Sequence, residues 1–63
     1  MDANQVIELA RQHMGKNSSA RLALMDAMTL NDKGRCSDAK KRALDSLKHS
    51  VGIFHDDYRK ASI

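Results

Sequence analysis

The stretch 37-SDAKKRALDSLKHSVGIFHDDYRK-60 decides the fold of this 63-residue chain. It contains no proline, and its large apolar residues recur at alternating spacings of three and four: Leu44, Leu47, Val51, Phe54 and Tyr58. On an α-helix this spacing places them within about 80° of one another around the axis. The pattern is typical of a helix that packs along one face, and it predicts a helix over about 38–60.

Two shorter helices are predicted before it. Asp2 and Gln5 have the spacing of a capping box, and Gly15 interrupts the pattern that follows them. The free N–H groups of a second helix, which stops before Gly34, can be capped by a side-chain oxygen of Asn17, Ser18 or Ser19. The expected bounds are about 3–14 and 18–31.

The chain is therefore expected to be all-α, because alternation of the strand type appears nowhere. Its length allows one domain, residues 1–63, near the lower limit for a fold without disulfides or metal. We predict a three-helix bundle, or a helical hairpin with an added N-terminal helix.

The unequal helix lengths predict self-association. A helix over 38–60 would be about 34 Å long, whereas the second helix would be about 21 Å long. The second helix would therefore be too short to pack against Phe54 and Tyr58. Two alternatives stay open: the first helix could cover this overhang, or the long helix could break at Gly52. We expect a homodimer, with an apolar contact surface on the second and third helices; its predicted members are Met25, Met28, Ile53, Phe54 and Tyr58.

A basic cluster precedes and enters the third predicted helix. Between Lys33 and Arg42 five basic residues face one acid, a local balance of +4 in a chain of net charge +3. The unpaired backbone N–H groups and the positive end of the dipole at a helix start favour an anion, which makes phosphate a candidate ligand. The candidate anion-binding residues are Arg35, Ser37, Lys40 and Lys41; the other interpretation is a solvated charge cluster.

The remaining polar residues do not suggest an enzyme. Asp45 and His49 share one helix face and supply too few ligands for a metal, and His13 is expected to form a hydrogen bond at the edge of the core. Cys36, the one cysteine, has no accompanying catalytic base, and a single cysteine fits a reducing compartment. No cofactor or metal is therefore expected.

The sequence also predicts a location. No stretch approaches the roughly 18 continuous apolar residues of a membrane span, and the N-terminus lacks the layout of a signal peptide. We expect a cytoplasmic, non-enzymatic interaction or adaptor module that self-associates and can bind a protein partner. The alternative is a small nucleic-acid-binding or regulatory protein that uses the basic cluster.

Overall fold

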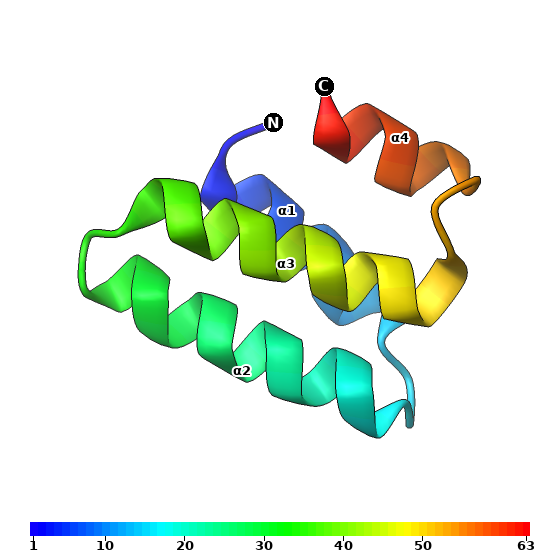
Figure 1. Ribbon diagram of the computed structural model, residues 1–63, viewed down its shortest axis with the longest axis horizontal. Coiled ribbons are helices and arrows are strands. Elements are labelled where there is room, and N and C mark those ends of the chain that lie inside the picture. The colour runs from blue at the N-terminus through cyan, green and yellow to red at the C-terminus, as the bar shows by residue number, and fades with distance from the viewer.

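Four helices make up the computed structural model, which describes all 63 residues. They are α1 (Ala3–His13), α2 (Ser18–Asp32), α3 (Cys36–Val51) and α4 (Asp56–Ser62). Figure 1 shows α2 and α3 as an antiparallel hairpin, with α1 behind α3 and the short α4 folded back above them. None of the four combines the length and the apolar character needed to cross a lipid bilayer.

The first two helices begin where their capping residues predict. Asp2 Oδ1 accepts a hydrogen bond from the Gln5 backbone N–H at 2.9 Å, and the Gln5 side chain accepts one from the Asp2 N–H at 3.0 Å. Asn17 Oδ1 accepts from the Ala20 N–H at 3.0 Å, and its amide nitrogen donates to the His49 carbonyl at 3.0 Å. The prediction of an all-α chain and of a capping box is thus confirmed.

The prediction of a single long helix over 38–60 is wrong, because the helix ends before Gly52. Helix α3 begins two residues earlier than expected, at Cys36, and ends at Val51, and Gly52 adopts φ 87° and ψ 163°. Only glycine enters this backbone region readily, since a Cβ atom would meet the neighbouring peptide groups. The α2 and α3 helices are consequently matched at 15 and 16 residues, and the predicted overhang does not exist.

Alanine dominates the interior. Twelve apolar residues are buried, eight of them alanines and four of them large: Val6, Ile7, Leu24 and Leu47. Small side chains allow helix axes to approach closely, and the molecule is correspondingly thin, with extents of 29 × 25 × 14 Å. The fold therefore depends on close packing of helices around a few large side chains.

Polar contacts hold the α2–α3 hairpin in register. The fully buried Ser46 hydroxyl of α3 donates to the Ala20 carbonyl of α2 at 2.6 Å. On the surface, Arg42 of α3 contacts Asp26 of α2 at 2.8 Å and Asp45 at 2.9 Å. Since the Ser46 hydrogen bond is shielded from water, it contributes more to specifying the register than the exposed ion pairs do.

Candidate interaction surface

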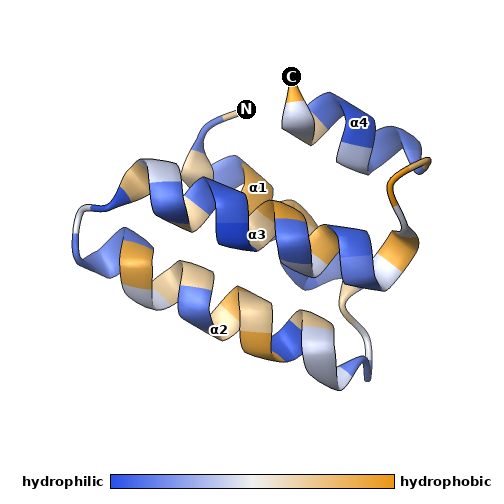
Figure 2. Cartoon of the chain, in the orientation of Figure 1, coloured by the Kyte–Doolittle hydropathy of each residue, from blue (hydrophilic) through white to orange (hydrophobic).

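The folded chain leaves more large apolar side chains exposed than it buries. Seven are exposed, against the four in the interior; the exposed ones are Met1, Leu22, Met25, Met28, Ile53, Phe54 and Ile63. Figure 2 shows apolar residues recurring along α2 and an apolar segment in the connection between α3 and α4. These two regions are the candidate contact surfaces.

The first region is the outer face of α2, which we define by Ser18, Arg21, Leu22 and Met25. These four residues line the one depression found on the molecule. Leu22 is 67% exposed and Met25 is 63% exposed, although they lie one turn apart in the most apolar helix of the chain. The buried residues of α2 lie on its opposite side, so this face is directed away from α1 and α3.

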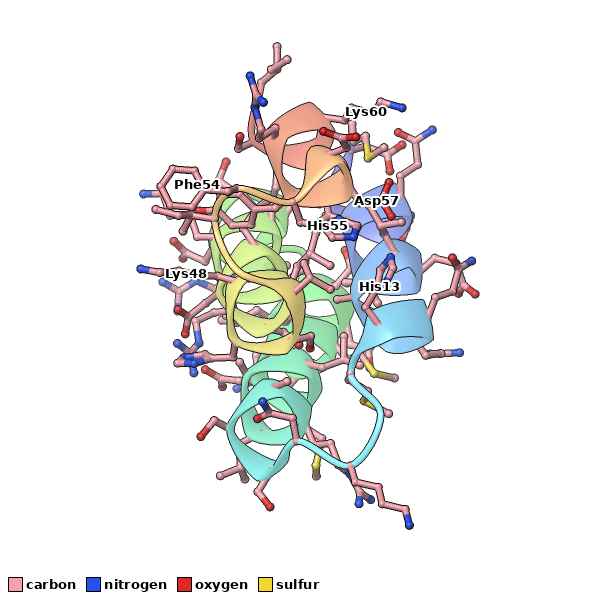
Figure 3. The ribbon with its side chains drawn as sticks, turned by 90° about the vertical axis from the view of Figure 1, so that its right-hand side faces the viewer. His13, Lys48, Phe54, His55, Asp57 and Lys60 are labelled. Atoms are coloured by element: carbon pink, nitrogen blue, oxygen red, sulfur yellow. The ribbon has the colours of Figure 1, made fainter.

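The second region is the hinge, Gly52–His55, which joins α3 to α4. Phe54 is 87% exposed, and Ile53 beside it is exposed as well. Figure 3 shows Phe54 and Lys48 directed to one side of the molecule, away from His13, His55 and Asp57. A phenylalanine ring in this position contributes little to the stability of the isolated fold.

The five residues predicted as a partner-binding surface lie on three separate elements. Met25 is on the outer face of α2, whereas Met28 lies toward α1, where its sulfur is 3.8 Å from Arg11 Nη2. Ile53 and Phe54 are in the hinge. Tyr58, on α4, is half-buried and packs against the core. Leu22, which the prediction omitted, belongs with Met25 on the outer face of α2.

A small polar cluster fastens the start of α4 to the end of α1. His13 Nε2 lies 2.7 Å from Asp57 Oδ2, and the His13 and His55 rings are 5.3 Å apart in an edge-to-face arrangement. His55 also caps α4, because its Nδ1 accepts from the Asp57 backbone N–H at 3.2 Å. The hydrogen bond expected for His13 is thereby confirmed, and its partner, 44 residues away, had no signal in the sequence.

The basic cluster is partly neutralised by neighbouring acids. Arg35 Nη2 contacts Asp38 Oδ2 at 2.7 Å across the first turn of α3, so a carboxylate already occupies the neighbourhood of Arg35 and Ser37. Arg42 is held by two aspartates, as described above. Lys40 and Lys41 form no ion pair within the chain. The phosphate site stays a prediction.

Groups able to carry out chemistry are dispersed over the surface. Cys36 is exposed, with its sulfur 3.9 Å from Asn31 Oδ1, and no three acidic, histidine or cysteine side chains are arranged to hold a metal ion. Comparison of the chain with protein-family models, curated proteins and solved structures gave no match.

Proposed function

We propose that this protein is a non-enzymatic helical interaction module that self-associates through the outer face of α2. The observation that supports this is the imbalance between exposed and buried large apolar side chains. Each such side chain contributes about 1.5–3 kcal/mol when it is fully removed from water. Contact with a second copy would recover free energy that folding of the single chain leaves unused.

The outer face of α2 has the spacing of a short coiled-coil seam. Ser18, Leu22, Met25 and Thr29 follow one another at intervals of four, three and four residues, which are the d, a, d and a positions of a heptad. In a parallel pair of α2 helices, Leu22 and Met25 would each pack against their counterparts. The small Ser18 and Thr29 at the two ends would let the helices approach closely.

Charges beside this seam complement each other in the same arrangement. Arg21 takes the g position and Asp26 the following e position, and in parallel pairs the g residue of one helix meets that e residue of the other. Arg21 makes no ion pair within its own chain. Asp26 is exposed and binds Arg42 through one of its two carboxylate oxygens. Arg21 of one copy can therefore reach Asp26 of the second copy.

The size of the surface predicts weak association. Leu22 and Met25 from two copies would together supply roughly 4–8 kcal/mol. The loss of translational and rotational freedom costs at least about 4 kcal/mol. At most about 4 kcal/mol then remains from these side chains, so we expect a dimer with a dissociation constant on the order of 1 mM, which the Arg21–Asp26 pairs would lower further.

Sedimentation equilibrium over a concentration series up to about 1 mM tests the proposal. Wild-type protein should show a concentration-dependent rise in mass, and Leu22→Asp should abolish it. Gln12→Asp is the matched control, because it makes the same change of charge at an exposed position of α1 and should leave association intact. A wild-type protein that stays monomeric throughout, or equal association of the two variants, would overturn the proposal.

A further inference from the structure

We infer that α4 is an exchangeable segment, which a second copy of this chain can supply in place of the chain's own α4. The hinge Gly52–His55 would open, and each α4 would dock on the core of the other copy in a domain-swapped dimer. The inference rests on the proposed self-association, but it uses contacts that lie outside the outer face of α2.

The closed hinge depends on the conformation of one residue. The Gly52 N–H still donates to the Lys48 carbonyl at 2.8 Å, so the helical hydrogen bonding reaches Gly52 before the chain turns. At φ 87° the turn requires glycine, yet a Cβ atom placed there would meet nothing within 4 Å. No packing contact around Gly52 holds the turn, so the closed form depends on the backbone freedom of glycine and on the docking of α4 against the core.

The apolar seam of α3 continues through the break. Extended helically, Phe54 and Tyr58 would fall on the same face as Leu47 and Val51, within an arc of about 60°. In the closed form Leu47 is fully buried and Tyr58 packs against the core, whereas Phe54 is exposed. The extended form gives Phe54 a place on the packed face of the helix, where it can meet its counterpart near the two-fold axis.

The length of the extended helix explains why a second copy is needed. A continuous helix from Cys36 to Lys60 would be about 37 Å long. This exceeds 29 Å, the longest extent of the whole molecule. The α4 residues would then project beyond the core of their own chain, and the site they normally occupy would be vacant. A second copy offers an identical site and an identical segment.

The contacts that dock α4 are few and can all form between two chains. Ala61 is fully buried as part of the core, Tyr58 packs against that core, and His13 Nε2 contacts the Asp57 carboxylate. A swapped dimer reproduces each of these contacts twice, so opening the hinge loses them only transiently. The net balance is then set by the hinge, where Gly52 and the His55 cap favour the closed turn, and by Phe54, which favours the extended form.

The first experiment changes the hinge in a Leu22→Asp background, where the α2 face cannot contribute. Gly52→Ala penalises the closed turn and removes a glycine from the extended helix, so the dimer fraction measured by light scattering should rise about ten-fold or more. Gly34→Ala is the matched control, because Gly34 has a similar φ of 79° and equally open surroundings. A monomeric Gly52→Ala protein, or equal dimer formation by both variants, would overturn the inference.

The second experiment keeps the natural hinge and tests exchange directly, so it remains informative if Gly52→Ala fails to fold. His13→Asp places two carboxylates opposite each other, and Asp57→Lys removes the acceptor of His13. Only a swapped heterodimer restores both contacts. At one site the natural Asp57 meets the natural His13, and at the other the introduced lysine meets the introduced aspartate. After joint refolding from urea, native mass spectrometry should show about ten-fold more heterodimer than either homodimer. A statistical mixture or monomers alone would exclude exchange of α4.

These experiments separate the two proposals. If Leu22→Asp abolishes association of the wild-type chain but neither hinge experiment yields a dimer, self-association through α2 holds and exchange of α4 fails. If the hinge experiments succeed while Leu22→Asp leaves wild-type association unchanged, the α2 interface fails and the exchange stands.

Discussion

Replacing Leu47 with alanine is expected to remove a large part of the stability of this protein. Leu47 is the largest of the fully buried side chains, and it lies where α3 faces the rest of the core. Domains of this length have a free energy of unfolding of roughly 3–9 kcal/mol. Truncation of a buried leucine to alanine costs about 2–5 kcal/mol, because the alanine-rich surroundings have few flexible side chains that could fill the cavity.

Two other leucines provide the comparison. Leu44→Ala, at a half-buried position packed against the core, is expected to cost about 1–2 kcal/mol. Leu22→Ala, on the outer face of α2, should cost less than about 0.5 kcal/mol in the monomer. The three changes remove the same atoms, so their ranking reports burial alone.

Urea unfolding followed by far-ultraviolet circular dichroism, at low micromolar concentration, provides the measurement. Leu47→Ala should shift the midpoint strongly toward low urea, or leave a chain that is unfolded without denaturant, while Leu22→Ala should superimpose on the wild type. Equal losses for Leu22→Ala and Leu47→Ala at a concentration where the protein is monomeric would refute the packing described above.

Three further outcomes are expected. Ser46→Ala should lower the free energy of unfolding by about 1 kcal/mol, seen as a fall of roughly 4–8 °C in the melting temperature, because the Ala20 carbonyl loses a buried donor; an unchanged melting temperature would show that water replaces it. His13→Ala should accelerate amide hydrogen exchange in α4 while leaving α2 and α3 protected, since His13 holds only the start of α4. Asp26→Asn should cost less than about 1 kcal/mol in thermal unfolding and nothing at high salt, because the pair with Arg42 is exposed to solvent; a larger, salt-independent loss would contradict this.

The candidate surface could be predicted only in part. Met25 was expected on an apolar contact face, but Leu22, its neighbour there, was not, because α2 is apolar on nearly all sides and its own pattern does not show which side faces out. Tyr58 was expected to need a partner outside the chain. In the structure α4 folds back and Tyr58 packs against the core of its own chain. The prediction of one continuous helix could not anticipate this contact.

The sequence by itself determined the helical class, the starts of α1 and α2, and the end of α2 before Gly34, because caps and apolar periodicity act over three or four residues. Only the tertiary structure decided the break at Gly52 and the contact between His13 and Asp57. A glycine inside a helix costs about 1 kcal/mol, which is too little to end the helix unaided. Docking of Tyr58 and Ala61 against helices distant in sequence supplies the rest, and such long-range contacts exist only once the whole chain has folded.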